Sequence, residues 1–301
     1  MADLGCNGHE GRSSTGSERG TCPEPVDTCP EPVDTCPEPV EGARRGRTAG
    51  RLPALPRPIG VGVGAKAIAH RGEPVGFREN TLPALTAALA APADLIEIDV
   101  KVTADGQVVL LHDDTLERLW GHPGEIRRLE LADLTALAGD GVRIPLLSEA
   151  LELLAGSGTA LLIDMDSAEW ATPSQRVVEQ AITAGRLDRS EIVWCGRTES
   201  LQVIREADPD ARIVLSWDEG NGNGGPPTDA VVDLLAPEAY NPHWPMMTGE
   251  VIDWARERQL ATCCWTVDDA ALMHQLLDLG VDALISNQIG TLRKVLDDRS
   301  R

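Results

Sequence analysis

The chain has 301 residues, of which 42% are hydrophobic, and this length allows one large domain or two smaller ones. Its formal net charge of -21 excludes a protein that binds nucleic acid through clustered basic residues. No stretch approaches the roughly 20 apolar residues of a membrane span and no secretory signal opens the chain, so we expect a cytoplasmic protein without a transmembrane segment. Cys195, Cys263 and Cys264 lie in apolar runs and are expected to be reduced and buried.

The N-terminal segment differs in composition from the rest of the chain. The heptad TCPEPVD occurs three times in succession over residues 21–41, with one change in the last copy. Proline in every copy prevents a helix or a central strand, and the cysteines lack the CxxC pairing of zinc sites. We therefore expect a disordered tail over residues 1–60 and one folded domain over residues 61–301.

From residue 66 onward, short apolar runs alternate with amphipathic segments, as in parallel α/β proteins. The remaining length fits a TIM (β/α)₈ barrel of ~250 residues. Polar residues gather at the C-terminal ends of the predicted strands, and a glycine-rich dinucleotide fingerprint is missing, so a barrel is favoured over an open doubly wound sheet. The predicted strands are 67–71, 95–100, 108–113, 160–166, 192–196, 212–217, 238–242, 261–267 and 283–287. Helical patterns lie between most of these strands, for example at 82–91, 148–155, 174–184, 199–207, 248–259 and 269–279.

A β-hairpin is predicted over residues 95–113. Only ADGQ separates its two strands, and this connection is too short for a parallel crossover. A two-residue turn at Asp105-Gly106 would place Asp99 opposite His112. Cross-strand partners share a face with Cβ atoms ~5 Å apart, so His112 is expected on the side of the sheet that carries Glu97 and Asp99.

The segment LIEIDV carries a candidate metal site. Glu97 and Asp99 are two residues apart on a predicted strand and therefore share a face. Two carboxylates in an apolar setting repel each other unless a cation bridges them, and such oxygen ligands suit Mg²⁺, Ca²⁺ or Mn²⁺. The alternative is a pair of surface acids on an edge strand.

Two histidines point to acid–base chemistry. His70 ends the first predicted strand, and the hairpin brings His112 to the carboxylates. Imidazoles beside a divalent ion can serve as proton acceptor and donor near neutral pH, although a lone histidine on an apolar strand is more often a core residue. Arg71 offers a fork of donors that matches a phosphate. The residue types of the neighbouring segment RENT at 78–81 are mostly explained if Asn80 or Thr81 caps the helix that follows.

These motifs resemble those of the glycerophosphodiester phosphodiesterases, within the phospholipase C-like phosphodiesterase superfamily. The resemblance covers residues from about 66 to 297 and implies a TIM barrel of the phospholipase C-like type. It also implies a divalent metal, commonly Ca²⁺ or Mg²⁺, and hydrolysis of small glycerophosphodiesters to glycerol 3-phosphate and an alcohol. The matching segments are AIAHRG, ENTLPAL, DLIEIDVKVTADGQVVLLHDDTLERL, IPLLSEAL, CWTVDD and LGVDALISN.

The resemblance also implies residue roles. His70 and His112 match the family's acid and base, without an order between them. Glu97 and Asp99 match its metal-binding pair, and Arg71 matches its phosphate-binding arginine. Glu79 of the ENT motif receives no definite role.

The chain departs from the family pattern after the fourth predicted strand. The family usually has Glu-x-Lys there, with a metal ligand and a phosphate contact, whereas this chain has Asp164-Met165-Asp166. Asp164 keeps the ligand type with a shorter reach and is expected to bind the metal. Asp166 reverses the expected charge, so Lys101, Arg78 and Arg197 are candidate replacements for the missing cation.

Two positions near the end of the chain complete the expected site. Trp265, near the C-terminal end of the predicted strand 261–267, is expected to pack against the carbon face of glycerol. The closing motif of the family, usually Asp-x-Pro, is Asn287-Gln288-Ile289 here, which weakens that end of the expected site.

Two other functions remain open from the sequence. The charge reversal at Asp166 would fit a barrel that binds phosphodiesters but has lost efficient catalysis. A lysophospholipase D would need an apolar approach to its site, for which only YNPHWPMM at 240–247 is a candidate. The sequence leaves open the alcohol, the metal, the nucleophile and the oligomeric state.

Overall fold

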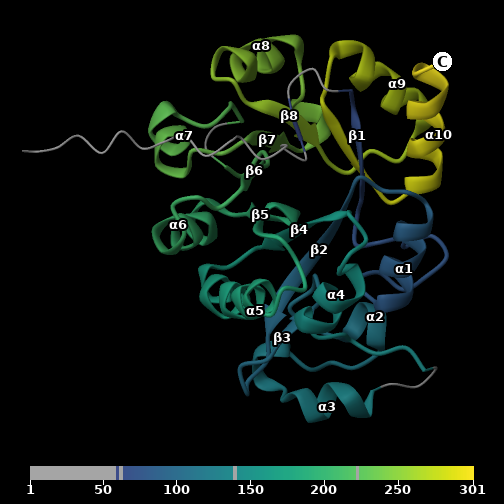
Figure 1. The fold of residues 1–301 in the computed structure, drawn as a ribbon, viewed down its shortest axis with the longest axis vertical. Coiled ribbons are helices and arrows are strands. Elements are labelled where there is room, and N and C mark those ends of the chain that lie inside the picture. Colours follow the sequence, from purple (N-terminus) through teal and green to yellow (C-terminus); the bar gives the residue numbers. More distant parts are fainter. Residues whose placement is uncertain (1–58, 61–63, 138–140, 222–223) are drawn as a thin grey trace, which may run out of the picture. The chain divides into compact units, whose positions relative to one another are not determined.

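The computed structural model describes residues 59–60, 64–137, 141–221 and 224–301. The predicted tail lies outside these ranges except for its last two residues. Eight parallel strands form a closed barrel in the order β1-β9-β8-β7-β6-β5-β4-β2, and β1 pairs with β2 to close it (Figure 1). The predicted TIM barrel is therefore confirmed. The barrel strands are β1 (Lys66–Ala69), β2 (Leu95–Val102), β4 (Ala160–Met165), β5 (Ile192–Gly196), β6 (Ile213–Trp217), β7 (Ala239–Pro242), β8 (Ala261–Cys264) and β9 (Ala283–Ser286).

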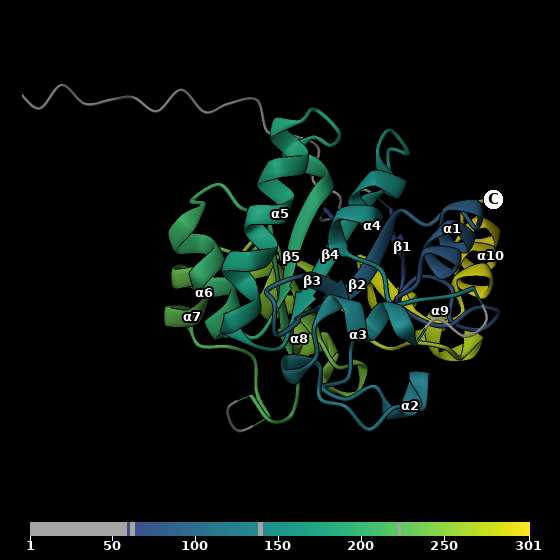
Figure 2. The ribbon, with the colours of Figure 1, turned by 90° about the horizontal axis from the view of Figure 1, so that it is seen from below.

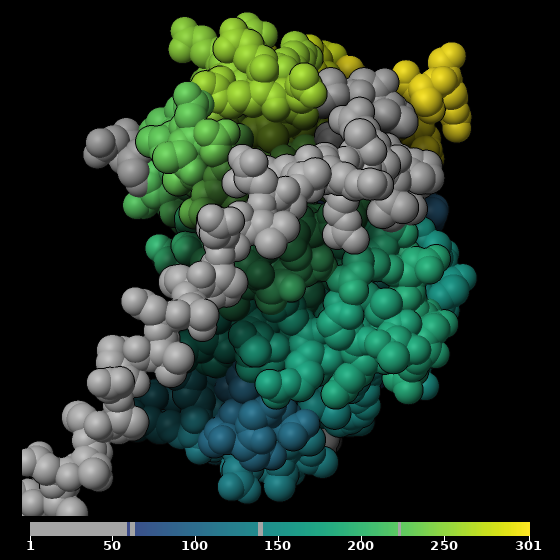
Figure 3. Space-filling view, turned by 60° about the vertical axis from the view of Figure 1, so that its left-hand side comes forward, coloured from purple at the N-terminus to yellow at the C-terminus, as the bar shows by residue number. Residues whose placement is uncertain are grey.

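Helices surround the barrel, as the view from below shows (Figure 2). All six predicted helices are present, within three residues of the expected ends. They are α1 (Leu82–Ala90), α4 (Leu147–Leu154), α5 (Ala171–Thr183), α6 (Thr198–Ala207), α8 (Gly249–Glu257) and α9 (Ala270–Leu279). The helices that were not named from the sequence patterns are α2 (Glu117–Trp120), α3 (Leu131–Ala136), α7 (Asp229–Leu235) and α10 (Ile289–Arg299). Teal segments around α5 and light-green segments around α8 form much of the coloured surface in Figure 3.

The side chains of each strand alternate between two cores. On β2, Ile96 and Ile98 pack outward against the helical layer. Leu95 instead belongs to the barrel interior, together with Ile59 and Ile68. Because residues two apart on a strand share a face, Glu97 and Asp99 lie on the same inner side as Leu95. The alternation thus places two acids inside the barrel, on the part of β2 that pairs with β4.

Local signals explain how two of the helices begin and how one of them ends. Thr81 caps α1 by accepting a hydrogen bond from the backbone amide of Ala84, and a proline lies in the first turn, as expected. Asp269 caps α9 in the same way, and Gly280 ends that helix in the left-handed conformation. Gly72 has a φ of 85°, and a Cβ there would lie 2.7 Å from the backbone of Ala84. This glycine therefore allows the turn after β1 to approach α1.

The hairpin is confirmed, but its predicted register was wrong by one residue. β3 (Val108–Leu110) pairs antiparallel with β2, with Val102 opposite Val108 and Val100 opposite Leu110. The backbone amide of Leu111, not of His112, donates to the carbonyl of Asp99. The cause is the turn, since Gly106 at a φ of 79° closes a three-residue loop rather than a two-residue one.

The described part of the chain contains no helix with the length and apolar character needed to cross a membrane. Cys195, Cys263 and Cys264 are buried and free of disulfides, as expected.

Candidate active site

A cavity of about 200 Å³ opens at the C-terminal ends of the strands. It brings together residues from widely separated parts of the sequence. Among the residues singled out from the sequence, it is lined by His70, Arg71, Glu97, Asp99, His112, Asp164, Asp166, Arg197 and Trp265. Of the other predicted residues, Lys101 lines a smaller adjoining cavity, and Glu79 and Asn80 lie behind the wall of the main one.

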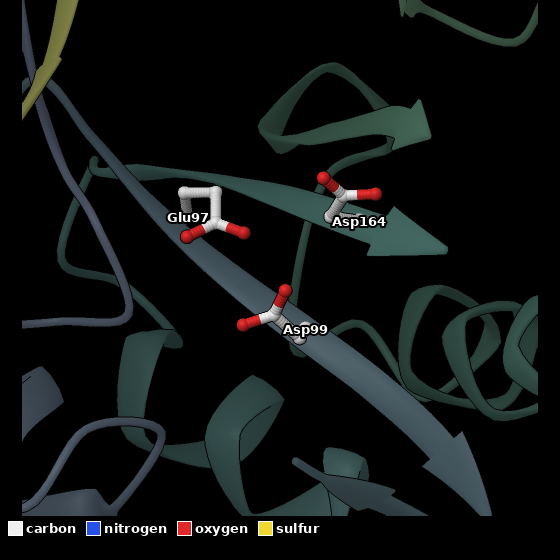
Figure 4. A group of neighbouring side chains, drawn as sticks. All are labelled: Glu97, Asp99 and Asp164. Atoms are coloured by element: carbon white, nitrogen blue, oxygen red, sulfur yellow. The ribbon is translucent and has the colours of Figure 1, made fainter. Parts of the chain in front are cut away.

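Three carboxylates converge in this cavity (Figure 4). Glu97 and Asp99 extend from β2 and Asp164 from β4, where Asp99 and Asp164 are register partners. One oxygen from each residue lies within 4.8 Å of the others, and this is the one such group of three acids, histidines or cysteines among the described residues. Three clustered carboxylates are the ligand type that Mg²⁺, Ca²⁺ and Mn²⁺ prefer. These three residues could therefore hold one divalent cation.

The three carboxylates are held at a high electrostatic cost. Burial raises the pKa of Asp164 to about 7, and the charges of Asp99 and Asp166 contribute to the rise. Burial, and next the charge of Asp99, also raises the pKa of Glu97 well above its usual value. Such shifts arise where like charges share a desolvated site, and a bound cation would reverse them.

Neighbouring side chains fix the orientation of Asp99 and Arg71. The amide of Asn80 donates to Oδ2 of Asp99 at 2.7 Å, and the backbone N–H of Asp99 donates to Oδ1 of Asn80 at 3.1 Å. Nη1 of Arg71 donates to Oε1 of Glu79 at 2.8 Å, and Glu79 also accepts from Arg118. Asn80, which was considered only as a helix cap, thus holds a carboxylate, and Glu79, which had no definite role, holds a guanidinium at the edge of the cavity.

The two histidines differ in their surroundings. Nδ1 of His70 lies 2.8 Å from Oδ1 of Asn287, and Nε2 lies 3.9 Å from Oε2 of Glu97. Burial, and then the charge of Arg71, lowers the pKa of His70, which favours the neutral imidazole. His112 is 47% exposed, and its Nδ1 lies 2.7 Å from Oδ1 of Asp113. Hydrogen bonds from Arg118 and His112 lower the pKa of Asp113 to about 2, so that carboxylate is ionised at neutral pH.

The structure accounts for the acid at position 166. Asp166 pairs with Lys101, whose side chain is only 2% exposed, and Lys101 also donates to Asp114 at 2.9 Å. Nε1 of Trp170 donates to the other oxygen of Asp166 at 2.8 Å. Lys101 thus brings a cation next to the position where the resemblance led us to expect a lysine. It lines the adjoining cavity of about 80 Å³ together with Asp99 and Asp164.

The opposite wall of the cavity contains polar residues to which the sequence patterns assigned no role. Ser216 lines it, and its hydroxyl accepts a hydrogen bond from the amide of Asn241 at 3.1 Å. Trp265 borders this wall, with its indole N–H donating to the carbonyl of Asn241 at 3.2 Å. Both Ser216 and Asn241 lie near the C-terminal ends of their strands, and this position was the available signal. The cavity thus has an acidic side and a side with hydroxyl, amide and indole groups.

Comparison with known proteins identifies the family. A family model described as "Glycerophosphoryl diester phosphodiesterase family" matches residues 70–291. A glycerophosphodiester phosphodiesterase of Caldanaerobacter subterraneus subsp. tengcongensis is 27% identical over 236 residues, which cover 75% of this chain and 95% of that protein. The "Probable glycerophosphodiester phosphodiesterase 2" of Mycobacterium tuberculosis is 30% identical over 254 residues, covering 77% of this chain and 91% of that protein.

Solved structures share the fold. A phosphodiesterase from Oleispira antarctica, in complex with the product sn-glycerol-3-phosphate, has a TM-score of 0.68 at 20% identity and covers 77% of this chain and 96% of its own. A glycerophosphodiester phosphodiesterase from Thermotoga maritima has a TM-score of 0.62 at 22% identity and covers 77% of this chain and 98% of its own. The family match spans both histidines and all three carboxylates. The chain therefore belongs to the glycerophosphoryl diester phosphodiesterase family, whose members are enzymes that hydrolyse glycerophosphodiesters.

Proposed function

We propose that this protein is a divalent-metal-dependent enzyme that hydrolyses small glycerophosphodiesters to glycerol 3-phosphate and an alcohol. The observation that carries the proposal is the convergence of three carboxylates, two histidines and an arginine on one cavity. The family supports the substrate class, and the metal, the products and the residue roles are the proposed part. The cytoplasmic location expected from the sequence remains part of the proposal.

Glu97, Asp99 and Asp164 would hold the metal. They fit a hard divalent cation because all three donors are carboxylates and because their closely spaced charges repel one another without one. Ca²⁺ or Mg²⁺ is proposed first and Mn²⁺ next. When bound, such an ion neutralises charge on the phosphoryl group and polarises it toward attack.

The protein's own groups would bind the diester and move protons. Arg71, held by Glu79, would donate hydrogen bonds to phosphoryl oxygens. His70 and His112 both line the cavity, so one can accept a proton from the nucleophile while the other protonates the leaving alkoxide. Trp265 would pack against glycerol carbons, and Lys101 would add positive charge beside the phosphate.

The ion pair of Asp166 with Lys101 favours an active enzyme over an impaired binding protein. The charge reversal at Asp166 was the reason to consider lost catalysis. Because Asp166 pairs with a cation from the neighbouring strand, its charge is offset within the site. We therefore propose that Lys101 neutralises the charge of Asp166 and that the site still binds phosphate.

Product identification tests the proposal. Purified full-length protein would be incubated with glycerophosphocholine, glycerophosphoethanolamine or lysophosphatidylcholine, each with Ca²⁺, Mg²⁺ or Mn²⁺, and the products followed by ³¹P NMR. We expect glycerol 3-phosphate from the first two substrates. Lysophosphatidic acid from the third substrate alone would instead identify a lysophospholipase D. No product with any metal would contradict a catalytic function.

A further inference from the structure

A chain of hydrogen bonds runs from the loop after β8 to His70. Oδ2 of Asp268 accepts from the side-chain amide of Asn287 at 2.8 Å. Oδ1 of Asn287 in turn lies 2.8 Å from Nδ1 of His70. Asp268 is exposed, Asn287 is partly exposed, and the His70 side chain is 14% exposed and lines the cavity. The chain thus connects the protein surface to an imidazole of the site.

The carboxylate of Asp268 accepts hydrogen bonds from three neighbouring donors, which hold it in place. The backbone N–H of Asn287 donates to Oδ1 of Asp268 at 2.8 Å. The hydroxyl of Ser286 donates to the same oxygen at 3.0 Å, while its own oxygen accepts from the backbone N–H of Gln288. A carboxylate can only accept, so the group of Asn287 that faces Oδ2 must be the amide NH₂.

This orientation determines which nitrogen of His70 carries the proton. With its NH₂ held by Asp268, Asn287 presents its carbonyl oxygen to Nδ1 of His70, and a carbonyl oxygen can only accept. Nδ1 must then carry the hydrogen, and the lone pair of the neutral imidazole is on Nε2, the nitrogen that lies nearest Glu97. The backbone supports the same placement, since β1 and β9 are register partners at Ala69 and Ser286.

We propose that Asp268 and Asn287 are positioning residues that hold His70 as the Nδ1–H tautomer, with Nε2 as the proton acceptor of the reaction. The assignment of acceptor rests on the proposed function. The O–H bond of the nucleophile breaks and its proton goes to Nε2 as the new O–P bond forms. The P–O bond to the alcohol breaks, and the alkoxide takes a proton from His112. The hydrogen-bond chain thereby assigns different roles to the two histidines.

Long-range ¹H–¹⁵N correlation spectra of the full-length protein with ¹⁵N-labelled histidine test the tautomer of His70 directly. The spectra would be recorded with Ca²⁺ above pH 7.5, with the His70 signals assigned by their loss in His70→Gln. We expect a protonated Nδ1 and an unprotonated Nε2 in the wild type. An unprotonated Nδ1 would overturn the proposal, whether or not any variant folds.

Two variants sharpen the test. In Asp268→Asn, an NH₂ group can take the place of Oδ2. The side-chain amide of Asn287 is then expected to flip and to donate to Nδ1 of His70, which moves the proton of the neutral imidazole to Nε2. The tautomer signal should change, and kcat should fall about tenfold or more with little change in KM. In the double variant Asp268→Asn/Asn287→Asp, a carboxylate at 287 accepts from both neighbours, so the original tautomer and most of kcat should return.

Matched controls separate positioning from folding. Asp269→Asn alters the adjacent carboxylate, which caps α9, and should leave both tautomer and kcat unchanged. Thermal unfolding of each variant reports on folding. An unchanged tautomer in Asp268→Asn, or no recovery in the double variant, would contradict the proposal. The expected tautomer in a wild-type protein that hydrolyses no diester would support the positioning and overturn only the proposed function.

Discussion

Three carboxylates, two histidines and an arginine meet in one cavity, and each is positioned by the barrel strand or loop that carries it. Residues two apart share a strand face, and this spacing alone predicted that Glu97 and Asp99 lie together. The partners of Asp166 and Asn287 could not be found this way. Asp166 meets Lys101 across 65 positions, and Asn287 meets Asp268 across 19. In the sequence, Asp166 and Asn287 each looked like the loss of a residue that the family usually has. Their partners could not be recognised there, because only the folded chain brings each partner close.

The buried carboxylates predict a pH-dependent stability of the metal-free protein. The pKa of Asp164 is about 7 in the folded chain, and an unfolded aspartate titrates near 4. Between these values the folded state binds more protons, so stability falls as pH rises from about 4 to 7. The full penalty above pH 7 is on the order of 4 kcal/mol.

Thermal unfolding with and without metal measures this penalty. In EDTA, we expect Tm to fall from pH 5 to pH 8. Added Ca²⁺ should raise Tm much more at pH 8 than at pH 5, because the ion binds the ionised carboxylates. An equal effect of Ca²⁺ at both pH values would show that these groups do not bind it.

Removing Lys101 should weaken substrate binding. Lys101→Met leaves Asp166 and Asp114 without their shared cation, beside the three carboxylates. We expect KM for glycerophosphocholine to rise about tenfold, which corresponds to ~1.4 kcal/mol, with a smaller change in kcat. Arg143→Met is the matched control, because Arg143 pairs with Glu149 and does not line the cavity. Equal KM values in the two variants would contradict a contribution of Lys101 to binding.

At the scale of elements, the strands and most of the longer helices were predictable because their apolar patterns are regular, although α10 was not among them. The hairpin register was not, since it depends on whether the turn has two or three residues. Short helices such as α2 and α3 also escaped prediction, because four to six residues give too little periodicity.

Gly106 should be required for the three-residue turn. Its φ is 79° and a Cβ there would meet no atom within 4 Å, so Gly106→Ala should cost about 1 to 2 kcal/mol through backbone strain alone. Gly290→Ala is the control, since Gly290 lies in α10 without a positive φ and has equal space. That change should leave stability unaltered or raise it by up to about 1 kcal/mol. Urea unfolding compares the two, and a harmless Gly106→Ala would contradict the turn geometry.

At the scale of the whole molecule, length and alternation of elements were enough to predict a barrel. They could not show where the folded unit begins. Ile59, which lies within the predicted tail, is fully buried in the barrel interior with Ile68 and Leu95. A single apolar residue beside a proline-rich segment carries no pattern that would have revealed this contact.

Truncation should locate the N-terminal boundary. A chain that begins at Arg51 is expected to keep the Tm of the full chain, because Arg51–Arg301 forms one compact unit. A chain that begins at Gly64 loses Ile59, and we expect a cost of about 2 to 5 kcal/mol, as for large-to-small changes in a core. Ile59→Ala in the longer chain is the control for length. Equal stability of the two truncated chains would show that Ile59 contributes nothing to the core.

We propose that a divalent ion on the three carboxylates enables hydrolysis of a glycerophosphodiester. The most direct measurement is the rate of glycerol 3-phosphate release from glycerophosphocholine, after EDTA treatment and during a Ca²⁺ or Mg²⁺ titration. We predict no release in EDTA, a saturable return of activity with metal, and loss of that return in Glu97→Gln and His112→Ala. Release that persists in EDTA, or that is unchanged in both variants, would contradict the account.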